Sequence, residues 1–532
     1  MTHSLGKKIG IASAILMGSV FLSRVIGLFR EMAVAYVGGL DASVDAYVVA
    51  FILPDIFNHI TAGGFFSVTF IPIFSGYLAR NRELEGWRIM NIILHSFGLL
   101  LLVLVILGMA FTPELVAITA EGRPDAAFRA MVVRMTRIIL PAQLFHLIGG
   151  LLMAVQYSKE RFLVPALSPL VYNLGIILGG LLLGPVIGME GFCWGVLAGA
   201  FLGPFLLQIW GARRVGMRYR FLLEPGHPEF VRYMKLTLPL MLGLTMMFSM
   251  EIFLKYFGAY LPEGSVAGLN FSKTVLLIPA GLFGYAVGTA SFPFMARLAN
   301  ENRIGEMNRL INTALRYLSL VLPFSILLIV LRRELVMILF ERGRFDADAT
   351  ALTAGILAFL LPCAVALSSY TVVVRGFYAM QNTLFPAVFL TAAVLCSLPV
   401  YWYGMRWFGA RGIASAVSLS VIFPVVLLYA LWNHRTGNRE SSGVYGLYLK
   451  VLLISIPVGA LAEWFRRWAF PPPEAAGTAE ALGAAAATGA AYALLFLLAG
   501  RLAKIREIEP LLERAARVLP WRHSGNSPRN MH

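Results

Sequence analysis

Residues 22–79 read LSRVIGLFREMAVAYVGGLDASVDAYVVAFILPDIFNHITAGGFFSVTFIPIFSGYLA, a run apolar enough to cross a membrane twice. It nevertheless carries Arg24, Arg30, Glu31, Asp45, Asp55 and His59. A charged side chain at the bilayer centre costs at least about 2.5 kcal/mol, so such residues usually face a bundle interior or a wet cavity. Two arginines near a bent helix therefore predict a cavity that receives an anion.

Helix breakers stand in the second half of this run. Pro54, the pair Gly63-Gly64 and Pro72 interrupt the second predicted helix, and Pro279 and Pro293 interrupt a later one. A broken helix at membrane depth is tolerated where its backbone is buried in protein or lines a cavity. We expect these prolines and glycines to act as hinges.

The composition predicts an all-α polytopic membrane protein. The chain has 532 residues, of which 58% are hydrophobic and 14% charged, and its mean hydropathy is +0.75. Soluble domains carry about 25% charged residues. The net charge of +16 is spread over short loops and the tail, which is typical of membrane topology and not of nucleic-acid binding. Cys193, Cys363 and Cys396 lack metal-ligand spacing, so we expect no metal site.

Apolar runs predict about fourteen membrane-spanning helices. They lie near residues 9–37, 44–78, 89–112, 128–156, 162–184, 190–211, 230–260, 265–297, 310–331, 350–379, 384–407, 411–433, 446–465 and 480–501. Lys7 and Lys8 precede the first span, and the tail after the last span is also basic. Because cytoplasmic loops carry the excess of Lys and Arg, both termini are predicted to be cytoplasmic.

One predicted outward loop is an exception to this charge rule. It carries four arginines, Arg332, Arg333, Arg342 and Arg344, whereas the outward loops after the first, fifth and seventh spans carry none. The outward loop that contains Arg123 and Arg129 also leans against the rule. The sequence around Arg342 and Arg344, FERGRFDADAT, holds acids and bases that we expect to cap helices and pair with one another.

An internal repeat organises most of the chain. Five pairs of helix breakers are each 221 positions apart: Pro72 and Pro293, Pro141 and Pro362, Pro165 and Pro386, Gly188 and Gly409, and Gly191 and Gly412. An even number of spans separates the partners, so the repeats are parallel. Transporters are commonly built from duplicated halves with the substrate site between them. We predict a six-helix N-lobe at 1–222, a six-helix C-lobe at 223–436, two further helices at 437–503 and a basic cytoplasmic tail at 504–532.

Specific motifs resemble the MurJ/MviN family of lipid II flippases, in the multidrug/oligosaccharidyl-lipid/polysaccharide exporter superfamily. In the first half they are SRVIGLFRE at 23–31, VDAYVVAF at 44–51 and GGFFSVTFIPIFS at 63–75. In the second half they are GSVAGLNFS at 264–272, IPAGLFGYAVGTASFP at 278–293, FERGRFDA at 340–347 and RGFYAMQNT at 375–383. The resemblance covers residues 5–435. It implies alternating access that carries the undecaprenyl-pyrophosphate-linked peptidoglycan precursor from the inner to the outer leaflet of the bacterial inner membrane.

The same resemblance implies a set of substrate-binding residues. Arg24 and Arg30 match the family's essential first-helix arginines, and Asp45 matches its acidic position at the start of span 2. Guanidinium groups suit phosphate oxygens. Six positions along a helix correspond to about 9 Å of rise and about 120° of rotation, so the two arginines are expected at different depths. Asp45 is expected to hold one of them in place. The alternative is that Arg24, Arg30, Glu31 and Asp45 form a charge network that only pins helices 1 and 2.

Several positions depart from the family pattern. Ile52 stands where a basic residue is expected, Asn58 and His59 replace paired arginines, and Gly63 replaces an acid. Lys273-Thr274 replaces an Asp-Arg pair, which moves the cation by one residue and about 100° around the helix. Lys255, four positions after Glu251, is expected to compensate, or else the two form only an i,i+4 pair.

Several functional alternatives remain at the level of the sequence. The substrate is lipid II or another polyprenyl-linked glycan, while a drug/cation antiporter and a non-transporting scaffold share the fold. No Walker loop is present and no enzyme activity or cofactor is expected. Coupling to the membrane potential or to a monovalent ion is expected instead. The expected partners are the lipid-linked glycan, membrane lipids and the cell-wall synthesis and division machinery, with no nucleic acid.

Overall fold

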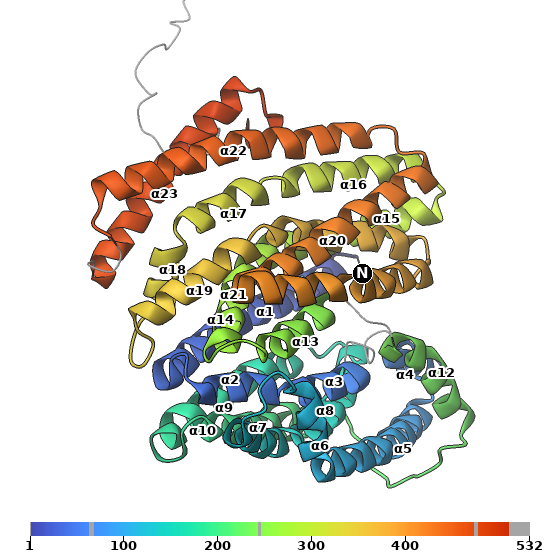
Figure 1. The fold of residues 1–532 in the computed structure, drawn as a ribbon. Helices are drawn as coiled ribbons and strands as arrows, with labels where there is room; N and C mark the ends of the chain where they lie inside the picture. The colour runs from blue at the N-terminus through green and yellow to red at the C-terminus, as the bar shows by residue number, and fades with distance from the viewer. Residues whose placement is uncertain (1, 63–68, 243–245, 473–476, 510–532) are drawn as a thin grey trace, which may run out of the picture. The chain divides into compact units, whose positions relative to one another are not determined.

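The structure is a computed structural model that describes residues 2–62, 69–242, 246–472 and 477–509. These residues form helices joined by short turns, and the described ranges contain no β-strand (Figure 1). The predicted hinges Gly63 and Gly64 lie outside the described residues. The all-α class predicted from composition is confirmed.

The helices follow one another closely along the chain. They are α1 (Thr2–Gly38), α2 (Ala42–Ala50), α3 (Ile52–Ala62), α4 (Ile71–Ala79), α5 (Glu83–Ala110), α6 (Thr112–Thr119), α7 (Ala126–Ile139), α8 (Ala142–Ser158), α9 (Leu163–Ile187), α10 (Glu190–Ala200), α11 (Gln208–Arg214), α12 (Pro228–Leu242), α13 (Met246–Gly258), α14 (Ser265–Pro279), α15 (Ala286–Asn300), α16 (Ile304–Leu318), α17 (Val321–Val330), α18 (Arg332–Phe340), α19 (Ala347–Leu360), α20 (Cys363–Ala379), α21 (Leu384–Thr436), α22 (Ser441–Ala469) and α23 (Thr478–Leu502). Two π-helical segments, η2 (Phe201–Leu207) and η3 (Ala280–Tyr285), and the 3-10 turn η5 (Arg506–Ile508) complete the series.

The chain divides into two compact units. Unit 1 comprises Met1–Thr274, Leu339–Ile356 and Ala387–Val417, and unit 2 comprises Val275–Ile338, Leu357–Pro386 and Ser418–His532. These units cut across the halves predicted from the repeat, so the predicted domain boundaries stay predictions.

Small residues set the closest helix packing in unit 1. α9 packs against both α1 and α10. Along the contact with α10, a Cβ atom on Gly175 or Gly179 would clash with the backbone at Gly199 or Gly195. Glycine-lined contacts of this kind are favoured in membranes, where close van der Waals packing replaces the hydrophobic driving force between helices.

Unit 2 contains the two helices that follow the repeat. α22 lies beside α17 and α23, and Val451, Val458, Tyr492 and Phe496 are buried in the core that the three helices share (Figure 1). The last helix, rich in alanine, is therefore packed against the unit along an apolar face.

The 221-residue repeat is present in the backbone as well as in the sequence. α7 at 126–139 recurs as α19 at 347–360, and α8 at 142–158 recurs as α20 at 363–379. Asp125 and Asp346 each accept backbone N–H bonds at the start of the following helix. Gly188 (φ 61°, ψ −140°) and Gly409 (φ 58°, ψ −136°) share one unusual conformation.

The predicted count of fourteen spans is not confirmed by helix length and composition. In the described part of the chain nine helices are long and apolar enough to cross a membrane, or ten when the bent pair α19 and α20 is taken as one span. Part of the difference has a clear physical cause. α21 is 53 residues long and covers two predicted spans, which the non-helical Gly409 separates. α2, α3 and α4 are 9, 11 and 9 residues long, so each is too short to cross alone.

The predicted hinge residues that lie in the described part of the chain occupy three kinds of position. Pro54 is in the first turn of α3 and Pro72 in the first turn of α4, where a missing N–H costs no helical hydrogen bond. Pro279 ends α14, directly before the π-helical η3. Pro293 lies inside α15. A hinge function for these residues stays a prediction.

Candidate functional site

Four charged side chains from three helices of unit 1 form what we call the lysine cluster: Asp55, Glu251, Lys255 and Lys273. The Nζ atom of Lys273 donates to both carboxylate oxygens of Glu251 at 2.6 Å. The Nζ atom of Lys255 lies 3.0 Å from Glu251 Oε1 and also donates to Asp55. The predicted i,i+4 pair of Glu251 and Lys255 is thus part of a larger group.

Burial makes these contacts energetically important. Lys255 is 4% and Lys273 7% exposed. An unpaired ammonium group removed from water is strongly destabilised, whereas a close carboxylate offsets much of that cost. With every group ionised, two lysines balance two carboxylates, so the lysine cluster is neutral as a whole. Each ammonium group lies beside a carboxylate in the space between the helices.

A second charged group surrounds Arg30 on α1. The Arg30 Nη2 atom donates to Glu31 Oε1 at 2.6 Å, and its Nη1 atom donates to the side-chain oxygen of Asn173 on α9 at 3.2 Å. The other Glu31 oxygen accepts a 3.0 Å bond from Asn270 on α14. Glu31 is 7% exposed. The bonds to Glu31 and Asn173 therefore fix the orientation of the Arg30 guanidinium group. The bond from Asn270 to Glu31 links this group to a third helix of unit 1.

The other predicted binding residues are less enclosed. Arg24 is exposed on α1, about one and two-thirds turns before Arg30. Asn58 is exposed on α3. The His59 ring stacks on Phe248 of α13, with ring centroids 4.0 Å apart.

Asp45 has a different arginine partner from the one predicted. Its Oδ2 atom accepts a 3.0 Å bond from Arg123, in the loop before α7, and a 2.8 Å bond from the backbone N–H of Gly264. Its Oδ1 atom accepts a 2.8 Å bond from the N–H of Ala267 in the first turn of α14. Asp45 is 1% exposed. The carboxylate therefore ties the start of α2 to the start of α14, where a negative charge also suits the helix dipole.

Glu263 extends this network at the surface of unit 1. One of its carboxylate oxygens accepts a 2.6 Å bond from the backbone N–H of Ala42, and the other lies 3.5 Å from Arg123 Nη2. Nearby, Arg344 donates to Asp41 at 3.2 Å. Four separate loops of unit 1 thus meet around the start of α2.

Sequence reasoning missed several of these partners. Asp55 was noted as an intramembrane charge but not placed with Lys255, and Asn173 and Asn270 were not singled out. Arg123 stood out only as a cation in a predicted outward loop. A usable signal was present in that case, because a buried acid such as Asp45 needs a cation and Arg123 breaks the loop-charge pattern.

The fold and these buried charges define a class: a multi-pass helical membrane protein with paired ionisable groups buried between its helices. The sequence also identifies the family, because the family model described as lipid II flippase MurJ matches residues 34–471. The chain belongs to that family. Among the described residues, no group of three or more His, Cys, Asp or Glu side chains is arranged to hold a metal ion.

Similar proteins carry the same description. The chain is 28% identical over 507 residues to the protein named "Probable lipid II flippase MurJ" of Rhizobium meliloti, covering 91% of this chain and 92% of that one. It is 24% identical over 455 residues to "Lipid II flippase MurJ" of Burkholderia cenocepacia, covering 84% of this chain and 88% of that one.

Solved structures agree on the fold. A structure of lipid II flippase MurJ in an inward closed conformation superposes with a TM-score of 0.75 at 21% identity, over 92% of this chain and 99% of that one. An inward-facing multidrug resistance MATE family transporter of the MOP superfamily gives a TM-score of 0.65 at 12% identity, over 77% of this chain and 94% of that one. The predicted relation to this superfamily of transporters is confirmed at the level of the fold.

Proposed function

We propose that this protein moves lipid II from the inner to the outer leaflet of the bacterial inner membrane by alternating access. Its relatives are named lipid II flippases, and the intramembrane cations suit the pyrophosphate of such a substrate. The observation that carries the proposal is the lysine cluster together with Arg30. Three basic side chains, Arg30, Lys255 and Lys273, lie between the helices of unit 1, each beside a carboxylate.

The chemistry of these cations supports a phosphate ligand. An ammonium group offers three donors, and a guanidinium group offers a planar fork that matches two oxygens at once. A pyrophosphate must cross a region where water is scarce, so donors already oriented in the protein interior replace part of its lost hydration. The carboxylates keep the cations charged and in place while the substrate is absent.

The neutral lysine cluster implies an exchange of partners. A pyrophosphate gains little from a lysine that stays fully engaged with Glu251, since the carboxylate competes for the same donors. We therefore infer that binding of the substrate draws Lys255 and Lys273 away from Asp55 and Glu251. The same exchange would couple the arrival of the anion to movement of α3, α13 and α14, which carry these residues.

The alternatives are ranked by the same contacts. Export of a drug or cation by antiport calls for carboxylates available to a cation, but Glu31, Asp45, Asp55 and Glu251 each have a basic partner. Another polyprenyl-linked glycan shares the pyrophosphate and would use the same cations, so it is the second candidate.

The remaining features of the proposal concern the setting of the protein. We place both termini in the cytoplasm and assign the driving force to the membrane potential or a monovalent ion. An interior-negative potential favours outward movement of an anion by about 2.3 kcal/mol per charge per 100 mV. The cell-wall synthesis and division machinery is the proposed partner that consumes the flipped substrate. No covalent step is required of any residue.

A rescue experiment tests the function. In a bacterium whose own lipid II flippase is switched off, the wild-type chain should restore growth and normal walls. Arg30→Ala should abolish that rescue at an unchanged protein level, because it removes the guanidinium group that Glu31 and Asn173 orient.

The matched control is Arg297→Ala, which removes an arginine from the exposed end of α15 and should leave rescue intact. Lysis with the wild-type chain at normal membrane expression would reject lipid II as the substrate. Full rescue by Arg30→Ala would reject the role of Arg30 in binding phosphate while leaving the transport function standing.

A further inference from the structure

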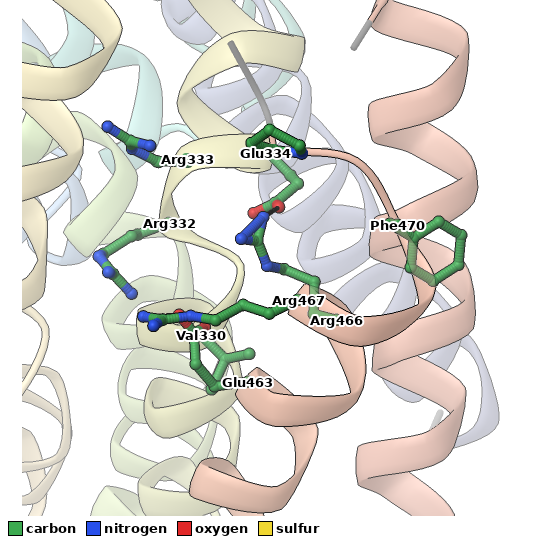
Figure 2. A pocket seen from close by; sticks show the side chains of 9 residues that line it. Val330, Arg332, Arg333, Glu334, Glu463, Arg466, Arg467 and Phe470 are labelled. Atoms are coloured by element: carbon green, nitrogen blue, oxygen red, sulfur yellow. Dashed lines mark hydrogen bonds and ion pairs between the residues drawn. The ribbon is translucent and has the colours of Figure 1, made fainter. Parts of the chain in front are cut away.

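A cavity of about 330 Å³ lies in unit 2, and it shares no lining residue with the lysine cluster or with the contacts of Arg30. One wall is the junction of α17 and α18, with Val330, Arg332, Arg333 and Glu334, and the other is the last turns of α22 with the residues that follow it (Figure 2). The second wall contributes Glu463, Arg466, Arg467, Phe470 and Pro472. We call this cavity the arginine pocket.

The arginine pocket is positively charged. Four arginines and two glutamates line it, so the ionised side chains leave two positive charges in excess. Arg466 points toward Glu334 in Figure 2 and donates to it at 2.7 Å, and Arg467 donates to Glu463 at 2.8 Å. These two pairs engage both glutamates of the wall, whereas Arg332 donates to a backbone carbonyl, so its positive charge adds to that of the pocket.

Donors at the pocket are already oriented. Arg466 is 9% exposed, and within the described ranges its buried Nε atom has no hydrogen-bond partner. Arg332, which donates to the carbonyl of Ile329, stands at the first position of α18, a helix of nine residues. The N–H groups at a helix start carry a partial positive charge and bind anions. The wall of the arginine pocket thus combines a buried donor, a helix N-terminus and four guanidinium groups.

Two tryptophans place the arginine pocket at the membrane surface. Trp464 and Trp468 stand one turn apart on α22 with stacked rings, centroids 6.3 Å apart, and they are 65% and 74% exposed. Exposed tryptophans of membrane helices concentrate at the level of the lipid headgroups. Arg466 and Arg467 lie between them in the sequence, so the pocket is at headgroup depth.

We propose that the arginine pocket binds the phosphate of an anionic glycerophospholipid, as a lipid site that shares no residue with the lysine cluster. The proposal explains why Arg332 and Arg333 occur in a loop that is an exception to the loop-charge rule. Basic pockets between membrane helices are suited to anionic headgroups. At about 30 Å³ per water molecule the cavity has room for about ten waters, which is ample for a phosphate and part of its glycerol.

Lipid retention by the purified full-length chain tests this site. Native mass spectrometry with equimolar phosphatidylglycerol and phosphatidylcholine of equal chain length should show preferential retention of phosphatidylglycerol. Arg332→Gln/Arg467→Gln should lower that preference by about tenfold, because each lost guanidinium removes a charge-assisted bond. Glu463→Gln should raise the preference, since it removes a negative charge from the pocket.

The control is Arg213→Gln/Arg214→Gln, an exposed arginine pair at the end of α11, where Arg214 lies over Trp210. It should leave the preference unchanged. An equal loss in this control, or equal retention of both lipids by the wild type, would overturn the proposal. Displacement of phosphatidylglycerol by millimolar inorganic phosphate would show a site for free phosphate and would overturn the lipid assignment. Rescue of flippase-depleted cells is independent of each result.

Discussion

Two aspartates four positions apart show how burial decides the value of a single ion pair. Asp41 pairs with Arg344, and both side chains are more than half exposed. Asp45 pairs with Arg123 and also accepts two backbone N–H bonds, at 1% exposure. Exposed pairs contribute little because water screens them, whereas removing one partner of a buried network leaves donors without acceptors.

Replacing Asp45 should therefore be far more damaging than replacing Asp41. Asp45→Ala is expected to lower the free energy of unfolding by about 3 kcal/mol, since Gly264, Ala267 and Arg123 all lose their acceptor. Asp41→Ala is expected to change it by less than about 0.5 kcal/mol. Both values follow from reversible unfolding in mixed detergent. Equal effects of the two substitutions would contradict the conclusion that the hydrogen bonds of Asp45 link the start of α2 to the start of α14.

The lysine cluster shows that burial also makes ion pairs important at the candidate site. Lys255 and Lys273 are buried between helices, and Asp55 and Glu251 lie beside them as acceptors. In the proposed function each lysine has both a structural role and a role in exchange with an anionic ligand, and neither role excludes the other.

Helices repeat at a fixed offset, and the turns that end them repeat with the same backbone angles. Gly188 ends α9, and Gly409 interrupts α21 at the equivalent position. At φ near +60° and ψ near −140° an L-residue with a side chain is strained, while a Cβ atom at either site would meet nothing within 4 Å. The strain is thus a property of the backbone alone.

Gly188→Ala and Gly409→Ala should each destabilise the protein by about 1–3 kcal/mol, and by similar amounts. The comparison is Gly483→Ala on α23, where a Cβ atom also meets nothing but the backbone is helical. That change should stabilise by about 0.5–1 kcal/mol. Thermal unfolding in detergent gives all three values. A neutral effect at Gly188 and Gly409 would show that these turns relax and that the repeat does not fix them.

At the scale of the whole molecule, the distribution of Lys and Arg predicts how the chain lies across the membrane. Asn302 lies in the turn between α15 and α16, on the predicted cytoplasmic side. Asp348 is exposed in the first turn of α19, on the predicted outer side. The two positions are separated by one predicted span, so they should face opposite compartments.

Single cysteines at these positions test the orientation. With Cys193, Cys363 and Cys396 replaced by alanine, Asp348→Cys should react with a membrane-impermeant maleimide in intact spheroplasts. Asn302→Cys should react only after the membrane is opened. Labelling of both in opened membranes confirms that each thiol is accessible. The reverse pattern in intact cells would place both termini outside.

The sequence by itself determined the class, the repeat and the family. Composition identifies a membrane protein because hydrocarbon excludes charge. Five matched pairs of prolines and glycines reveal the duplication because helix breakers act on local backbone geometry. The pair of Glu251 and Lys255 was predictable for the same reason, since positions four apart share one face of a helix. All of these signals depend on residues close together in the chain or on a constant spacing.

Only the tertiary structure decided which charges meet. Asp45 and Arg123 are 78 positions apart, and Asp55 and Lys255 are 200 apart. No periodic pattern links such residues, because their contact results from the packing of whole helices. The arginine pocket likewise joins residues of α17, α18 and α22 that appear unrelated in the sequence. The local sequence determines the helices and where they are interrupted, whereas the partner of each buried charge depends on how those helices pack.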